Sequence, residues 1–231
     1  MATFVLVHGS WGGGWCWDRL RPLLESAGHT VLTPTLTGLA ERSGLSAPDV
    51  GLGVHAREIA ELLESEGVVD AILVGHSYGG MVITGAAALA PDRVGQVVYA
   101  DAFAPVTGES AFTMLPWLEK AFSESPGPAE WEVAALDPGL LGADDEAAAW
   151  LSSRMTPMPR LTHEEPLGPG SEDALAGKAV TYIYCADQAL FTDIAASAEK
   201  RGFRVVALRD ITHVGLLTSP HILERELLNL V

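Results

Sequence analysis

The chain has 231 residues, of which 48% are hydrophobic, and its formal net charge is −16. This length provides one sizeable core, is too short for two ordinary enzyme domains, and combines with the apolar content to exclude a disordered chain. A field of this sign repels phosphate backbones and anionic membranes, which excludes nucleic acid and membrane surfaces as partners. No apolar run approaches the roughly 18 residues of a membrane span.

The N-terminal residues and the cysteines indicate the compartment. Residues 4–7, Phe-Val-Leu-Val, have no basic segment before them and run directly into His-Gly, so they predict a first strand and not a signal peptide. Cys16 and Cys185 are too few for a disulfide framework, and no metal-ligand spacing surrounds them. We therefore expect a soluble cytoplasmic protein, and the sequence leaves a homodimer open.

Strand-like and helix-like runs alternate along most of the chain, which is typical of a parallel sheet with helices on both faces. Strands are expected at residues 3–8, 30–33, 71–75, 94–101, 179–185 and 203–208. Helices are expected at residues 17–27, 58–64, 81–89 and 193–201 and after Pro220. The pattern predicts an α/β fold.

Residues 105–177 interrupt this alternation. Prolines and glycines are frequent there, acidic residues cluster at 144–146, and bulky apolar residues stand between the breakers. The segment is too long for a plain connection in a compact domain. We expect an α/β core made of residues 1–104 and 178–231, with residues 105–177 inserted as a cap, or lid.

Residues 75–79, Gly-His-Ser-Tyr-Gly, carry the most informative motif. They fit G-x-S-x-G, follow an apolar strand and precede an Ala-rich helix. In that context the turn lifts Ser77 to the top of the sheet, and the start of the helix directs unpaired N–H groups at any negative charge that forms there. Ser77 is therefore the candidate nucleophile.

A serine hydroxyl needs a base, and the base needs an orienting acid. His213 lies just past the last strand, where a loop can hold an imidazole over Ser77, so it is the expected base. Asp187 follows the strand at 179–185 and is the first candidate for the acid, giving the order Ser, Asp, His. Asp101, at the end of an earlier strand, and Asp210 remain alternatives.

The Gly-rich loop after the first strand is the candidate oxyanion loop. Residues 9–16 do not fit G-x-G-x-x-G, and no acidic residue for a ribose ends the next strand. The backbone N–H groups of Ser10 and Tyr78 are instead expected to converge on the oxygen that becomes negative during acyl transfer.

Several segments resemble the plant methylesterase and hydroxynitrile lyase group and its bacterial relatives, within the α/β-hydrolase superfamily. They are residues 8–11 (His-Gly-Ser-Trp), 14–17 (Gly-Trp-Cys-Trp), 28–29, 75–81, and the segments around Asp187 and His213. The resemblance implies a mostly parallel six-stranded core, a cap over the serine, no metal and no cofactor. It also implies small ester substrates, methyl esters among them.

Two positions depart from the lyases of that group. Those enzymes have a threonine where Gly9 stands and a lysine where Val214 stands. The departures favour a serine esterase that forms an acyl-enzyme on Ser77. A non-hydrolytic enzyme on the same triad, such as a lyase, acyl transferase or cyclase, is the alternative, and a receptor on the same fold is a further one.

The substrate pocket is expected to be apolar or aromatic, because the inserted segment is rich in aromatic residues and methionines. The candidate pocket walls are Trp11, Tyr78, Phe103, Trp117, Met155 and Val214.

Overall fold

The computed structural model describes residues 1–171 and 173–231, and these residues form one six-stranded parallel sheet. Its strands are β1 (Thr3–Val7), β2 (Thr30–Leu32), β3 (Ala71–Ser77), β4 (Val94–Ala102), β7 (Ala179–Cys185) and β8 (Arg204–Leu208). Their order across the sheet is β2-β1-β3-β4-β7-β8, and every neighbouring pair is parallel. The predicted fold class is confirmed.

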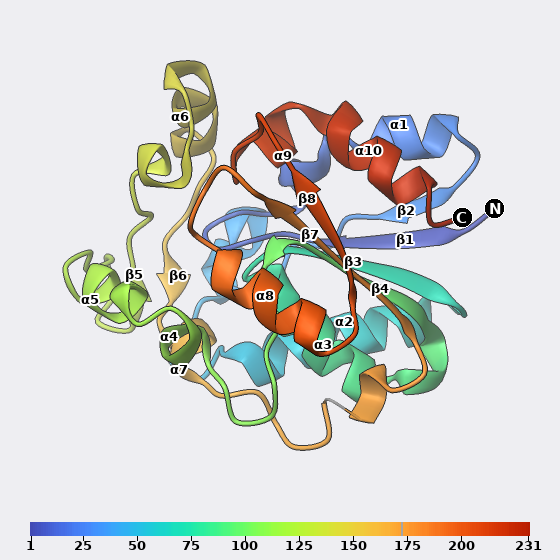
Figure 1. The fold of residues 1–231 in the computed structure, drawn as a ribbon. Helices are drawn as coiled ribbons and strands as arrows, with labels where there is room; N and C mark the ends of the chain where they lie inside the picture. The colour runs from blue at the N-terminus through green and yellow to red at the C-terminus, as the bar shows by residue number, and fades with distance from the viewer. Residues whose placement is uncertain (172) are drawn as a thin grey trace.

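Side chains along each strand point alternately to the two faces of the sheet. Both sets of side chains are apolar, so both faces are buried. Phe4 and Leu6 of β1 belong to one buried cluster, and Val5 and Val7 belong to the other. Helices α1 (Arg21–Ser26), α9 (Gly215–Thr218) and α10 (Pro220–Leu228) cover the first face. Helices α2 (Leu52–Ser65), α3 (Gly79–Leu89) and α8 (Thr192–Lys200) cover the second (Figure 1).

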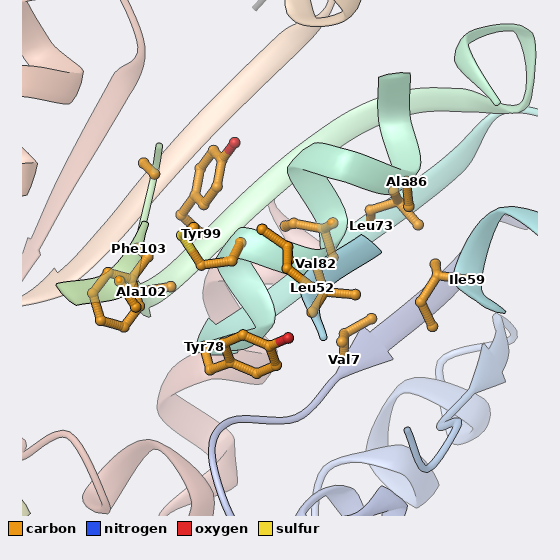
Figure 2. Close-up of a cluster of buried hydrophobic side chains, with 14 of the residues drawn as sticks. Val7, Leu52, Ile59, Leu73, Tyr78, Val82, Ala86, Tyr99, Ala102 and Phe103 are labelled. Atoms are coloured by element: carbon orange, nitrogen blue, oxygen red, sulfur yellow. The ribbon is translucent and has the colours of Figure 1, made fainter. Parts of the chain in front are cut away.

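The second face holds the helix that follows Ser77. Figure 2 shows Val82 and Ala86 of α3 in one cluster with Leu73 of β3 and Ile59 of α2, and all four are buried. Burying a side chain such as Val or Leu contributes about 1.5–3 kcal/mol to folding. The start of α3 is therefore supported on a rigid base.

One expected helix is shorter than the sequence pattern predicts. Residues 17–27 divide into a 3-10 turn, η1 (Gly14–Trp17), and the helix α1 (Arg21–Ser26). Pro22 lies in the first turn of α1, where its missing N–H costs no helical hydrogen bond. The apolar periodicity is continuous across the break, which is why the pattern indicated a single helix.

Between β4 and β7 the chain leaves the sheet. This segment contains α4 (Ala111–Met114), α5 (Trp117–Ser123), β5 (Glu132–Val133), η4 (Pro138–Leu141), α6 (Asp145–Ser152), β6 (Met158–Pro159), α7 (Leu161–Glu164) and η5 (Asp173–Leu175). β5 and β6 form a small antiparallel pair. In Figure 1 the elements from α4 to α7 gather at the left, beyond the end of the sheet where β1 finishes.

Short 3-10 turns, η2 (Ala40–Leu45) and η3 (Pro91–Arg93), complete the described structure. No helix within residues 1–171 or 173–231 combines the length and apolar character that crossing a bilayer requires.

Candidate active site

Ser77 lies on a sharp turn between β3 and α3. Its φ is +55°, a left-handed conformation that L-residues rarely adopt and that commonly marks functional sites. A Cβ on Gly75 would lie 2.6 Å from the Gly79 carbonyl carbon, and one on Gly79 would lie 2.4 Å from the Val7 carbonyl oxygen. Both glycines are therefore required by close backbone approach, as the motif predicts.

The loop after β1 lies directly against Ser77. A Cβ on Gly9 would be 2.8 Å from the Ser77 Cβ, so there is no room for a side chain at position 9. Next in the chain is Ser10, and Tyr78 is the residue that caps the start of α3. In the described part of the chain, neither the Ser10 nor the Tyr78 backbone N–H donates to a protein acceptor. Two unpaired donors thus flank the serine.

His213 lies in the loop between β8 and α9 and is held by three contacts. Its backbone N–H donates to Gln188 Oε1 over 2.5 Å, and its Nδ1 donates to Asp101 Oδ2 over 2.7 Å. The ring also stacks on His76 with 4.3 Å between centroids. Because a carboxylate only accepts, the proton of neutral His213 is on Nδ1 and its Nε2 carries a lone pair.

The structure corrects the prediction for the acid. Asp101, on β4, and not Asp187 meets the imidazole of His213. The Asp187 carboxylate lies past the end of β7, pairs with Arg209 over 3.1 Å and accepts the Asp210 N–H over 2.8 Å. Its side chain is 44% exposed. Asp187 therefore ties the β7 and β8 loops together on the surface.

Asp101 is positioned by its place in the sheet. β4 is hydrogen-bonded to β3, and Ser77 is in register with Ala102, the next residue after Asp101. A φ of +47° turns the chain at Asp101, whose Oδ1 accepts the Cys185 N–H from β7 over 2.9 Å. Asp101 and His213 are both almost fully buried. The buried carboxylate thus has two donors, which burial of a charge requires.

Ser77 and His213 line one apolar cavity of about 70 Å³. Five of the six candidate pocket walls line it as well: Trp11, Phe103, Trp117, Met155 and Val214. The Tyr78 ring, also expected there, lies beneath the site, and its hydroxyl contacts His55 Nδ1 at 3.0 Å. No hydrogen bond joins Ser77 to His213 among the described residues, and catalytic hydrogen bonds often tighten only when substrate binds.

Three other histidines support the site in their neutral form. Burial lowers the pKa of His8 and of His55 to about 4, and burial also holds the pKa of His76 well below its ordinary value. His8 holds the loop backbone, because its Nδ1 donates to the Gly9 carbonyl and its Nε2 accepts the Leu36 N–H. His76 Nε2 donates to the His213 carbonyl over 3.1 Å.

His163 is the residue of the site that the sequence did not reveal. The sequence pattern predicts a surface or structural role, because nothing local distinguishes it from other polar residues of the insertion. In the structure it is 1% exposed and lines the cavity with Ser77. Only the packing of α7 against the loop after β1 brings it there.

Comparison with known proteins supports the family resemblance that the sequence predicts. A model described as the alpha/beta hydrolase family matches residues 4–226. The chain belongs to this family. The hydrolase is 40% identical over 177 residues to a carbendazim hydrolyzing esterase of Nocardioides sp. (strain SG-4G), covering 72% of this chain and 73% of that one.

Plant relatives also match the hydrolase, over shorter stretches. Methylesterase 8 of Arabidopsis thaliana is 34% identical over 58% of this chain and 48% of its own length. An alpha-hydroxynitrile lyase of the same plant is 38% identical over 45% of this chain and 41% of its own. These matches confirm the predicted resemblance, and the esterase relatives confirm the predicted enzyme class, a carboxylic ester hydrolase.

Solved structures show the same fold. An extracellular alpha/beta-hydrolase from a Paenibacillus species superposes with a TM-score of 0.86 and 24% sequence identity, covering 99% of this chain and 98% of that chain.

Proposed function

We propose that this ester hydrolase cleaves small carboxylic esters through an acyl-enzyme on Ser77, with His213 as the base and Asp101 as the acid that orients it. The observation that carries the proposal is the buried 2.7 Å contact between His213 and Asp101 beside a serine on a strained turn. Buried charged groups of this kind are costly unless they are paired, and they cluster at functional sites.

The residues fit the steps of acyl transfer. The Nε2 lone pair of His213 takes the proton of Ser77 as its Oγ attacks the ester carbonyl, and Asp101 stabilises the imidazolium that forms. The N–H groups of Ser10 and Tyr78 bind the developing oxyanion, and each such donor is worth about 3 kcal/mol. His213 then protonates the leaving alkoxide, and water attacks the acyl-enzyme with His213 again as base.

The insertion supplies the cap in this proposal, with the core in residues 1–104 and 178–231. Its residues Trp117, Leu118 and Met155 line the same cavity as Ser77. The walls are mostly apolar, and the polar residues that line the cavity besides Ser77 and His213 are Ser10, His76 and His163. Such a pocket suits a small apolar or aromatic acyl group. Methyl esters fit, because a small alcohol needs little space beside Ser77.

The residues at positions 9 and 214 favour hydrolysis over the lyase alternative. A side chain at position 9, where the resembling lyases carry threonine, would lie 2.8 Å from the Ser77 Cβ. Val214, where they carry lysine, is buried and lines the cavity with an apolar surface. Without that hydroxyl and that ammonium group, the release of cyanide loses their support.

The test compares wild-type enzyme with Ser77→Ala on p-nitrophenyl acetate and on methyl esters of graded acyl size. The variant should lose at least about 10³-fold in kcat. A fluorophosphonate probe should label the wild type and not the variant. Incorporation of ¹⁸O from water into the product acid should accompany turnover. A variant that keeps most of the activity, or product without ¹⁸O, would overturn hydrolysis at Ser77.

Compartment and oligomeric state remain predictions. Cys16 and Cys185 are both buried and free, which fits a cytoplasmic location with reduced thiols. A homodimer stays open.

A further inference from the structure

His163 touches the side chains of both residues whose N–H groups flank Ser77. Its Nε2 lies 2.9 Å from Ser10 Oγ. Its ring stacks on the Tyr78 ring with 4.8 Å between centroids and an angle of 19° between planes. His163 belongs to α7 of the insertion, whereas Ser10 and Tyr78 belong to the core. One buried imidazole therefore joins the cap to both sides of the oxyanion hole.

The hydrogen bonds around His163 run in one direction. Thr162 Oγ1 donates its single proton to the Pro159 carbonyl over 2.7 Å, because a carbonyl can only accept. The contact of 2.9 Å between Thr162 Oγ1 and His163 Nδ1 must then be donated by Nδ1. In neutral His163 the Nε2 atom consequently carries a lone pair, so Ser10 Oγ is the donor to it.

The chemistry of the pocket keeps His163 neutral. Burial and, to a lesser extent, the nearby His55 lower the pKa of His163 to about 3. Aromatic rings surround it, with Trp11, Phe112 and Phe122 within 6.4 Å between centroids. A phenylalanine would fill this space without the cost of desolvating an imidazole. We therefore attribute the presence of an imidazole here to its hydrogen bond with Ser10.

We propose that His163 is a positioning residue that holds the Ser10 and Tyr78 amides in place for the oxyanion, and that it does so only when the cap is seated on the core. The inference rests on the proposed function, because it requires an oxyanion formed at Ser77. Donors must lie about 2.7–3.1 Å from that oxygen, and a displacement of 1 Å can cost about 10²-fold in rate. Fixing the Ser10 side chain and the Tyr78 ring limits such displacement of their backbone.

The test separates the two contacts of His163 by substitution. His163→Phe keeps the stacking on Tyr78 and removes the acceptor for Ser10, and Ser10→Ala removes the donor. His163→Gln restores an acceptor near the position of Nε2. Trp131→Ala is the matched control. Trp131 is an insertion residue that is 39% exposed, and among the described residues it makes no hydrogen bond or ring contact with Ser10 or Tyr78.

We expect His163→Phe and Ser10→Ala each to lower kcat on p-nitrophenyl acetate by about 10- to 100-fold with KM within about 3-fold of wild type, because oxyanion contacts form in the transition state. Binding of a trifluoromethyl ketone, which forms a tetrahedral oxyanion on serine, should weaken by a similar factor. The double variant should be no slower than His163→Phe alone, and His163→Gln should recover most of the loss.

Folding is checked by the thermal midpoint of each variant. Folded His163→Phe with wild-type kcat and ketone affinity would overturn the inference, as would a loss that appears only in KM. The inference would also be overturned if the losses in kcat of His163→Phe and Ser10→Ala were additive in the double variant. Ser77→Ala, assayed in parallel, distinguishes failure of the proposed function from failure of the role of His163. If it stays active, the proposed function fails, and if it is inactive while His163→Phe is unaffected, only the role of His163 fails.

Discussion

The Nδ1 atom of His213 lies 2.7 Å from Oδ2 of Asp101, and each side chain is 2% exposed. The other carboxylate oxygen of Asp101 accepts the backbone N–H of Cys185. Both oxygens are thus occupied, each by a donor from a different element. This arrangement places the proton of neutral His213 on Nδ1 and leaves a lone pair on Nε2.

Asp101→Asn should abolish most of the activity while the fold persists. The Cys185 N–H still needs an acceptor, so the new amide oxygen stays on that side and its NH₂ group faces His213. The His213 proton is then forced onto Nε2, the wrong tautomer for a base. We expect kcat to fall by about 10⁴-fold, as wrong-tautomer triads do.

The matched control is Asp187→Asn, which changes an exposed carboxylate paired with Arg209. We expect kcat within about 2-fold of wild type, since an exposed pair contributes only about 0–1 kcal/mol. If the two variants behaved in the opposite way, Asp187 would be the acid in spite of the geometry.

Gly9→Ala should reduce kcat by at least about 10-fold without unfolding the protein. The new methyl group would lie 2.8 Å from the Ser77 Cβ and 3.3 Å from His76 Nδ1, so the turn at Ser77 must shift. Displacement of a nucleophile by a fraction of an ångström is expensive in rate. Gly44→Ala is the control, because a Cβ at Gly44 would have open space, and this variant should keep full activity. Gly28→Ala is not a clean control, because the φ of Gly28 is +89°. Equal kcat for Gly9→Ala and Gly44→Ala would contradict the crowding argument.

Stability should fall as pH decreases from about 6.5 towards 4. His8, His55 and His163 have folded-state pKa values of about 4, 4 and 3, below the ordinary value of 6.5. The unfolded chain binds protons first as pH falls, so each group removes up to about 1.4 kcal/mol per pH unit in that window. Above pH 6.5 all three are neutral in both states and the effect vanishes.

Urea unfolding at pH 7.5, 6.0 and 5.0 measures this dependence. His163→Phe removes one of the three groups, so its free energy of unfolding should depend less steeply on pH than that of the wild type. Parallel curves for the two proteins would show that His163 does not titrate in this window on unfolding.

Trp117→Ala should change the preference for acyl size. The Trp117 side chain lines the cavity and is 43% exposed, which places it between the site and solvent. Removing it should raise KM for long or aromatic acyl esters by about 10-fold and leave the acetate ester within about 2-fold, since a buried aromatic contact is worth about 1.5–3 kcal/mol. The measurement is kcat/KM over a series of esters of increasing acyl size, for Trp117→Ala and for Trp131→Ala as the control. An equal effect of Trp117→Ala on all esters would contradict a pocket wall at Trp117.

Local patterns in the sequence were enough to predict the sheet, the turn at Ser77 and the loop that carries His213. Short apolar runs predict which segments are strands, and the glycines at 75 and 79 predict a turn too tight for any other residue. These features depend on neighbours along the chain. The same reasoning identified Trp11 and Met155 as cavity residues from their chemical character.

Tertiary packing alone decided which carboxylate meets His213 and which residues His163 contacts. Asp101 and Asp187 both come at the ends of neighbouring strands, so their local signals are alike, yet a turn at φ +47° keeps Asp101 inside while Asp187 turns to Arg209 at the surface. His163 has no local signal, because its partners Ser10 and Tyr78 lie 153 and 85 positions earlier in the chain. Side-chain contacts between distant segments are set by how the elements pack, which short-range periodicity does not record.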